Sequence, residues 1–510
     1  SMSQKFAEEC DGCNNRATGT ISIKDDNTSS EIYGMYNSSE NNIYNSFSFG
    51  TGQGATKNGS DGSIIITKSE TSSGNIIGMQ GGKNLYNAYA NTSDGVNTNV
   101  RAVGKINITH NGYGDVIGIR GTNSAGKINN ALAYLNSAVS DAVAEGSIVL
   151  SGKGNVYGIY GNGTIANSET QFNKNYNMLK DFSSHGVIDV TTRSDTAAAY
   201  GIYAAGAKDT KTSVYNAMGY NSTGDIKVRN TSGGSAFGIY SAAQTYTGDD
   251  DVVYYNNTYN AFRSSAIYGD SVATGNIDMT IEGYSSLGQQ VAGIYAAGNA
   301  FNSYANSGSD VMLETIGNIT INDKSETGNM NLRGIESNGA TIANAYSTGQ
   351  NQNTATKVTG NINVNILATK NGLSTASGIF SDSINPQGTK IYNAALVNDK
   401  NNVEGNITVN ASSGRAPNRM YGIYATSYKT GENAEDAQPK TVYNAYYENG
   451  SDVAEGKVRG NINVIAKNAT TNSMGEYYGI YVQDGAAYNA YSSNANADVI
   501  GTITVDVVGG

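Results

Sequence analysis

The sequence lacks several residue types and patterns, and each absence narrows what the protein can be. It has only 3 Pro among 510 residues, fewer than a disordered chain usually carries. No apolar run approaches the roughly 18 residues that span a bilayer as a helix. The net charge of −11 lacks the basic excess that nucleic-acid phosphates or an anionic membrane surface would favour. Trp is absent, and Cys and His occur only twice each.

The abundant residues indicate a β-rich chain with polar turns. Gly occurs 63 times, and Asn, Ser and Thr are frequent, which suits many short strands joined by turns. The aromatic residues are 36 Tyr and 9 Phe. Tyr combines a ring that fits a strand with a hydroxyl that tolerates water, so it suits a narrow rod with few fully dry positions.

A strand motif of the form Gly-x-Ile-x-Val recurs along the whole chain, as in residues 317–321 and 360–364. Its glycines, or their counterparts, are Gly19, Gly62, Gly104, Gly146, Gly186, Gly224, Gly275, Gly317, Gly360, Gly405, Gly460 and Gly501. This spacing gives about eleven repeats of roughly 43 residues. A repeat of that length is typical of a solenoid, which remains one structural unit however long it grows.

Two further motifs follow the first in the same order in every repeat. The second, Tyr-Gly-Ile-Tyr, has its glycine at Gly34, Gly78, Gly118, Gly158, Gly201, Gly238, Gly293, Gly334, Gly378, Gly422 and Gly479. The third, Tyr-Asn-Ala-Tyr, has its asparagine at Asn45, Asn87, Asn130, Asn167, Asn216, Asn260, Asn302, Asn344, Asn393, Asn444 and Asn489.

The three motifs predict an all-β fold, a parallel β-helix or solenoid with three strand motifs per repeat. Apolar residues within a motif recur with a period of two, which is the period of a strand. The residue after the second-motif glycine is Met or Ile in every repeat, so we expect this column to point into the core. Because the gaps between motifs vary, we prefer one coil with long corner loops to two shorter coils per repeat. One coil per repeat predicts a rod of roughly 50 Å.

The third-motif asparagines are expected to form a ladder along the rod. Stacked Asn side chains can each donate to the next amide and accept from the one before, which satisfies them in a buried or corner position. The residue after each Asn is always Ala or Ser. This small side chain implies either the close approach of another sheet or a tight bend.

We assign residues 1–18 to a tag scar and an N-terminal cap segment, and residues 19–510 to a single β-solenoid domain. The last strand motif ends close to Gly510 with no cap after it, so we expect the native protein to continue. A long Gly/Asn/Ser/Thr-rich parallel β-helix of this kind resembles the passenger region of a Gram-negative autotransporter surface protein. That resemblance implies export and display by a C-terminal membrane domain, hence a cell-surface or secreted location.

Three local patterns suggest chemistry, and each has a plainer explanation. Cys10 and Cys13 form C-x-x-C, which we interpret as a short disulfide in the cap, because a redox or zinc site would need partners that the sequence lacks. Residues 121–127 resemble the start of a P-loop, but Ile128 stands where Ser or Thr would bind magnesium. The acidic residues 249–251 carry calcium-type ligands, although a solvated loop tip is the simpler interpretation.

Polysaccharide lyases and hydrolases with a β-helical fold are the main catalytic alternative. Such enzymes need carboxylates and basic side chains clustered on one face of a few successive coils. We do not expect Asp189, Asp225 and Asp278 to lie on a single pair of neighbouring coils facing a basic residue at matching positions. Two histidines, His110 and His185, do not supply a Ser–His–Asp constellation. We therefore predict that the chain is not an enzyme and has no catalytic, cofactor or metal site.

An outward aromatic stripe is the main candidate for binding. Alternation from the inward Ile column places the residue two positions after each second-motif glycine outside. The predicted ligand-binding residues are Tyr160, Tyr203, Tyr240, Tyr295, Tyr424 and Tyr481, with Tyr36 and Phe380 in the same column. Aligned rings can stack on sugars or on a partner's side chains. The alternative is a ladder of rings that stack on one another, or rings covered by corner loops.

These features lead to a primary hypothesis of a surface-displayed or secreted β-helical adhesin or stalk. Its expected partners are a glycan, a host or bacterial surface protein, or a second copy of itself, with no nucleic acid and no membrane insertion. Repeated weak contacts would supply the affinity, and specificity would reside in the long corner loops 242–259 and 425–459. A polysaccharide-processing enzyme and a passive structural spacer are the alternatives.

Overall fold

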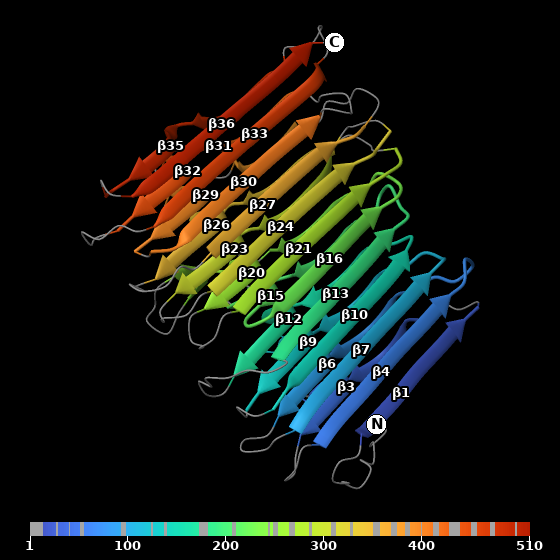
Figure 1. Ribbon diagram of the computed structural model, residues 1–510. Coiled ribbons are helices and arrows are strands. Elements are labelled where there is room, and N and C mark those ends of the chain that lie inside the picture. Colours follow the sequence, from blue (N-terminus) through green and yellow to red (C-terminus); the bar gives the residue numbers. More distant parts are fainter. Residues whose placement is uncertain are drawn as a thin grey trace.

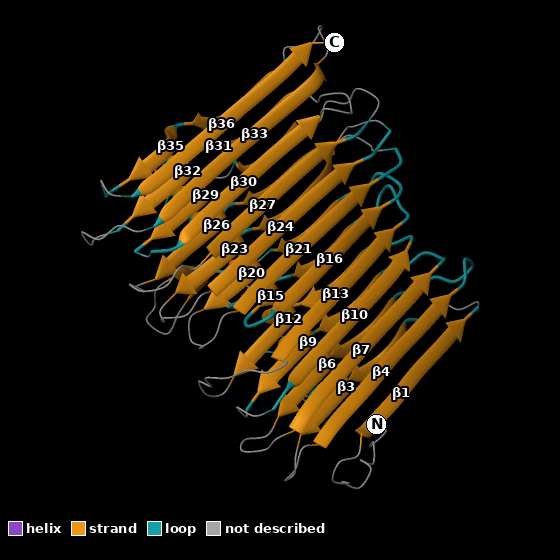
Figure 2. Ribbon diagram, in the orientation of Figure 1, coloured by secondary structure: helices purple, strands orange, loops and turns teal. Residues whose placement is uncertain are grey.

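The computed structural model contains three parallel β-sheets that wind around one axis. It describes residues 14–26, 29–39, 41–50, 56–92, 98–123, 126–136, 140–172, 182–206, 211–242, 245–247, 253–264, 271–284, 288–307, 313–326, 330–349, 357–368, 375–382, 388–398, 400–411, 418–427, 439–449, 456–469, 475–494 and 497–509. All the regular structure in these residues is β-strand, joined by loops at the corners (Figure 2).

Sheet A contains the first-motif strands. They are β1 (Asn14–Asp25), β4 (Thr56–Lys68), β7 (Thr98–His110), β10 (Ala142–Gly152), β13 (Phe182–Thr192), β16 (Ser222–Asn230), β21 (Ser271–Ile281), β24 (Leu313–Asp323), β27 (Lys357–Ile366), β30 (Asn402–Ala411), β33 (Lys457–Ala469) and β36 (Asp498–Gly509). β1 begins at Asn14 and therefore extends into the segment that the sequence assigns to the cap.

Sheets B and C contain the second and third motifs. The strands of sheet B are β2 (Ile32–Asn37), β5 (Ile76–Gly81), β8 (Val116–Gly121), β11 (Val156–Gly161), β14 (Ala199–Ala204), β17 (Ala236–Ser241), β22 (Gln289–Ala296), β25 (Met330–Ser337), β28 (Thr375–Ser381), β31 (Arg419–Thr426) and β34 (Glu476–Gln483). The strands of sheet C are β3 (Ile43–Gly50), β6 (Leu85–Thr92), β9 (Lys127–Leu135), β12 (Thr164–Phe172), β15 (Ser213–Met218), β20 (Asn257–Ser264), β23 (Asn299–Ser307), β26 (Thr341–Gly349), β29 (Thr389–Val397), β32 (Lys440–Glu448) and β35 (Gly485–Ser492). A small antiparallel pair, β18 (Thr245–Thr247) and β19 (Val253–Tyr255), lies in the loop before β20.

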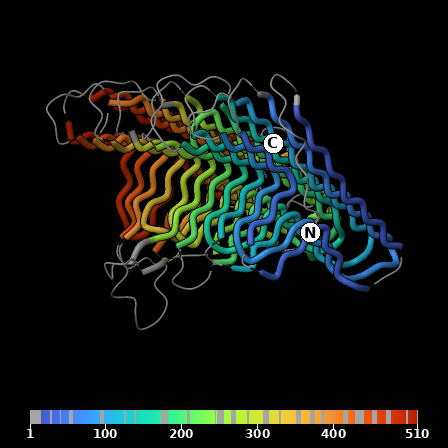
Figure 3. The backbone as a smooth tube through the Cα atoms, turned by 90° about the horizontal axis from the view of Figure 1, so that it is seen from below, coloured from blue at the N-terminus to red at the C-terminus, as the bar shows by residue number. Residues whose placement is uncertain are grey.

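Each repeat is one coil, as the variable gaps predicted. The sheets contain 12, 11 and 11 strands in sequence order, so β4 pairs with β1 only after β2 and β3 have completed a turn. The coils follow one another from the N-terminal to the C-terminal end of the rod (Figures 1 and 3). First-motif glycines pair with one another along the rod, as Gly275 does with Gly317 and Gly317 with Gly360.

The long strands of sheet A pack against sheet B with one half and against sheet C with the other. After the first-motif glycine, inward residues such as Ile106 join the main core with Met79 of sheet B. Before that glycine, Ala102 packs with Ala88 and Ala90 of sheet C. The small residue that follows each third-motif Asn is therefore explained by the close approach of another sheet.

The repeated glycines are required by contacts between sheets. A Cβ on Gly275 would lie 2.1 Å from the backbone oxygen of Asn260, so no side chain fits there. In the second motif, a Cβ on Gly238 would lie 2.4 Å from Cγ2 of Ile277 and 2.6 Å from the oxygen of Gly293. The absence of a side chain at each glycine thus allows its backbone to pack directly against atoms of another sheet.

The predicted asparagine ladder is confirmed. Within the rod each Nδ2 donates to Oδ1 of the Asn in the next coil, as from Asn216 to Asn260 at 2.8 Å and from Asn260 to Asn302 at 2.8 Å. The same amide also donates to the first-motif glycine, as from Asn260 to the oxygen of Gly275 at 2.8 Å. The ladder therefore joins neighbouring coils and also fastens sheet C to sheet A.

Candidate functional site

The predicted aromatic stripe lies on the outer face of sheet B. All six predicted residues are partly exposed, and Tyr240 lies between Tyr203 and Tyr295 with nearly parallel rings, at centroid distances of 4.9 and 4.5 Å. Tyr160 stacks on Tyr203 in the same way, at 5.1 Å. The flat faces of these rings are therefore occupied by their neighbours. A ligand on this side would meet ring edges and hydroxyl groups, so their role in binding stays a prediction.

A second aromatic column runs beside the first, and the sequence reasoning missed it. Tyr157, Tyr200 and Phe237 precede the second-motif glycine, and their rings stack at 4.9 and 5.1 Å. Tyr200 and Tyr203 meet edge to face at 5.0 Å, so both columns share the outer face. Burial raises the pKa of Tyr200 to about 12, which keeps its phenol protonated. The sequence pattern that could have indicated this second column is the aromatic residue at each end of the Tyr-Gly-Ile-Tyr motif.

Sheet C carries a similar pair of columns, which the sequence reasoning also left unassigned. Tyr259 stacks between Tyr215 and Phe301 at 5.2 and 5.1 Å. Tyr304 stacks between Phe262 and Tyr346 at 5.5 and 5.6 Å. These residues belong to a largely buried cluster, so on sheet C the rings mainly stabilise the stack of coils.

An ion pair takes the place of the rings of sheet B at β25. Arg333 lies 3.5 Å from the ring centroid of Phe380, and its Nη1 contacts Glu336. A planar guanidinium stacks on an aromatic face, so Arg333 can replace a ring in the column. Burial raises the pKa of Glu336, while Arg333 opposes that shift. Nearby, Lys440 donates a hydrogen bond to Ser381 at 2.8 Å. Burial lowers the pKa of Lys440 to about 8.

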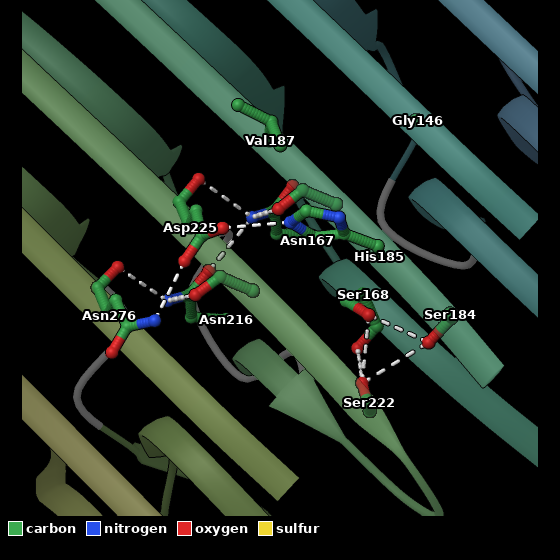
Figure 4. Close-up of polar contacts among 12 residues, drawn as sticks. Gly146, Asn167, Ser168, Ser184, His185, Val187, Asn216, Ser222, Asp225 and Asn276 are labelled. Atoms are coloured by element: carbon green, nitrogen blue, oxygen red, sulfur yellow. Dashed lines mark hydrogen bonds and ion pairs between the residues drawn. The ribbon is translucent and has the colours of Figure 1, made fainter.

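The outer face of sheet A carries a second, partly exposed row of polar side chains. Each Asn donates to the preceding one, as from Asn318 to Asn276 at 2.8 Å and from Asn361 to Asn318 at 2.8 Å. The row ends at Asp225, which accepts from Asn276 at 2.7 Å on one oxygen and from His185 at 2.8 Å on the other (Figure 4). The hydrogen bond with His185 is the main cause that lowers the pKa of Asp225 and raises that of His185.

The expectation for the acidic residues of this face was wrong in part: the three aspartates come from three strands, but two of them flank a basic residue at a matching position. Asp189, Lys227 and Asp278 occupy one register position on the neighbouring strands β13, β16 and β21. Acidic and basic side chains thus alternate there, and Lys227 also contributes to the lowered pKa of Asp225. The sequence reasoning failed because loops of different length separate these motifs, and only register counted from each glycine aligns them.

Ser184 precedes His185 in β13 but faces the other way, into a buried cluster of three serines. Ser168, Ser184 and Ser222 are buried and hydrogen-bond to one another at 2.7, 2.8 and 3.2 Å. They lie apart from the His185–Asp225 pair in Figure 4, because successive residues of β13 point to opposite faces. These three serines therefore do not form a Ser–His–Asp arrangement with His185 and Asp225.

The remaining local patterns do not add a site among the described residues. Lys127 of the P-loop-like segment begins strand β9, so a strand stands where that motif needs a helix. Cys10, Cys13 and residues 249–251 lie outside the described residues, as do parts of 242–259 and 425–459. The prediction that 425–459 is one corner loop was wrong, because strand β32 lies within it. In the part of the chain that the structure describes, no three metal-binding side chains come together. That same part contains no helix suited to crossing a membrane.

Comparison with known proteins leaves function to be argued from geometry. No protein-family model, curated protein or solved structure matched this chain.

Proposed function

We propose that this chain is an adhesin or stalk displayed on a bacterial surface or secreted, and that its repeated outer faces bind a partner. The supporting observation is the in-register repetition of outward side chains. Tyr203, Tyr240 and Tyr295 present the same hydroxyl groups in successive coils, and Asn318 and Asn361 repeat the same amides on sheet A. Weak contacts repeated along a rigid rod give high avidity without any single strong site.

The partners compatible with these faces are a glycan, a host or bacterial surface protein, or a second copy of the chain. Amide and hydroxyl groups can donate to and accept from the hydroxyls of a sugar, and the same groups can meet an exposed peptide backbone. We also propose the autotransporter route of export, on the resemblance of the solenoid. The full-length gene tests this part: a C-terminal membrane domain would support it, and a different neighbouring domain would refute it.

Two matched variants separate the faces in a binding experiment. Replacing Tyr160, Tyr203, Tyr240 and Tyr295 together by Phe keeps the stacked rings and removes only their hydroxyls. Replacing Asn318, Asn361 and Asn406 by Ala removes three consecutive amides from the outer row of sheet A.

Each protein would be applied to arrays of glycans and matrix proteins, and light scattering would follow self-association. We expect one variant to lose at least tenfold in avidity. Full binding by both variants would contradict repeated-face recognition, and no binding by the wild-type protein would favour a passive spacer.

A polysaccharide-processing enzyme is the second candidate, favoured by the charged residues around His185 and Asp225. His185 is oriented by Asp225, and Asp189 and Lys227 follow further along the same outer face, so this face offers acid and base groups. Incubation with pectin-like and host polysaccharides tests this alternative. Product formation that is lost in His185→Gln would establish catalysis, whereas no product from any substrate would leave the adhesin proposal as the better one.

A further inference from the structure

The outer face of sheet A is hollowed where β1, β4 and β7 lie side by side. Two cavities of about 440 and 460 Å³ share Arg16, Asp61 and Arg101 in their lining. The register pairs Gly59 with Arg16 on one side and with Arg101 on the other. A position without a side chain therefore lies between two arginines, and this gap opens the first of the two cavities, which Gly59 lines.

Ion pairs hold both arginines in place and leave part of each guanidinium available. Arg16 donates from Nε to Oδ2 of Asp61 at 2.7 Å, and its Nη2 contacts the same oxygen. Arg101 donates from Nη2 to both carboxylate oxygens of Glu145, at 3.0 and 2.9 Å. A guanidinium has five N–H groups. Among the described residues, neither Nη1 contacts an acceptor, so both are free to bind a ligand.

The hollow is more basic than the rest of the protein. Lys57 and Lys105 each line one of the two cavities and are exposed. Together with the two arginines they give the hollow four cationic side chains. Its three carboxylates are those of Asp61, Asp141 and Glu145, so the hollow has a net positive charge, whereas the whole chain has a net charge of −11. The amide of Asn99 and the hydroxyls of Thr18 and Thr20, at outward positions of the same strands as the two arginines, also line the hollow and can meet hydroxyl groups. This combination suits a ligand that carries one anion and several hydroxyls.

We propose that this hollow binds a carboxylated saccharide of one or two sugar units. The planar guanidinium groups match a carboxylate, and the Asn99 amide with the Thr18 and Thr20 hydroxyls matches ring hydroxyls. The cavity volumes fall within the range of small-molecule sites, about 300–1,000 Å³. The site is independent of the proposed function, because it uses neither the tyrosine columns nor the asparagine rows.

Calorimetric titration with digalacturonate, with uncharged galactobiose as its counterpart, tests the site. We expect digalacturonate to bind at least tenfold more tightly, and to weaken as salt screens the charges. Gly59→Leu is the decisive variant. A Cβ there has nothing closer than 3.9 Å, so the leucine fills the hollow without displacing the backbone. Ser183→Leu is the matched control, because Ser183 faces outward at the same register position farther along sheet A.

The expected result is at least a tenfold loss of digalacturonate affinity in Gly59→Leu and in Arg101→Gln, with Ser183→Leu unchanged. Equal binding of galactobiose would refute the role of the carboxylate. Binding that survives Gly59→Leu would refute the location. Displacement by an equal concentration of inorganic phosphate would show a general anion site and overturn the saccharide assignment, as would absence of digalacturonate binding to the wild-type protein.

Discussion

Replacing Asn260 by leucine tests whether the buried asparagine ladder holds the coils together. The side chain is fully buried, and its Nδ2 donates to Oδ1 of Asn302 and to the oxygen of Gly275, both at 2.8 Å. Leucine has a similar volume but can neither donate nor accept, so both acceptors lose this hydrogen bond. Asn216 loses Oδ1 of Asn260 as an acceptor but still donates to the oxygen of Gly224 at 2.8 Å. A buried polar group left without its partner costs about 1–3 kcal/mol. Two such groups predict a loss of about 2–6 kcal/mol in the free energy of unfolding.

The matched control is the same substitution at the exposed end of the ladder. Asn489 also donates to a first-motif glycine, at 2.9 Å to the oxygen of Gly501, but water reaches this position. We expect Asn489→Leu to cost less than about 1 kcal/mol. Urea unfolding measures the total change, and hydrogen exchange in β20 and β21 measures local opening, because a repeat array can open in parts. Equal costs at the two positions would refute the role of the ladder.

Three further predictions concern packing, stacking and charge. Gly275→Ala places a Cβ 2.1 Å from the oxygen of Asn260, so urea unfolding should show a loss of about 3 kcal/mol or more. Tyr240→Ala removes two stacked ring pairs and should lower the free energy of unfolding by about 1–3 kcal/mol. The raised pKa of His185 makes its hydrogen bond with Asp225 stabilising below pH 6.5 and lost as pH rises through that pKa. The lowered pKa of Asp225 makes the bond stabilising above pH 3.8 and lost as pH falls through it. Stability should therefore be greatest between these two values, by less than about 1 kcal/mol because solvent screens the pair.

Each of these predictions has a control in the same protein. Gly59→Ala has open space for its Cβ and should be neutral, so an equal loss at both glycines would contradict the contact argument. Tyr36 is 58% exposed, and Tyr36→Ala should cost less than about 1 kcal/mol. A similar cost for Tyr240→Ala would show that stacking contributes little. His185→Gln should flatten the pH profile, and an NMR titration in which the imidazole of His185 has an ordinary pKa would refute the pairing.

Much of the fold was predictable because the structure repeats by translation. Asn260 contacts Asn216 and Asn302, which are its own counterparts in neighbouring coils. A column of identical residues in the sequence therefore becomes a column of contacts in space. The same logic correctly placed the Ile that follows each second-motif glycine in the core and predicted one coil per repeat.

The outer surface was harder to predict, because simple alternation fails at the second motif. Counted from the inward Ile202, a period of two would bury Tyr200, yet Tyr200 faces outward beside Tyr203. The irregularity falls at Gly201, where a Cβ would lie 2.3 Å from Cγ2 of Ile226 of sheet A. The hollow near Gly59 was equally hidden, since its arginines meet their carboxylates on adjacent strands. Such diagonal contacts depend on register and side-chain reach, and no motif encodes them.

The direction of the asparagine ladder makes the length of this protein adjustable in whole steps. Every coil presents an acceptor to the coil before it and a donor to the coil after it, as Asn260 does toward Asn216 and Asn302. Removing or duplicating one complete repeat would join the same donor to the same acceptor and leave all three sheets in register. Insertions of other lengths have to be accommodated in a corner loop. Gene segments encoding single repeats can therefore be gained or lost, changing the reach of the rod without redesigning its interior.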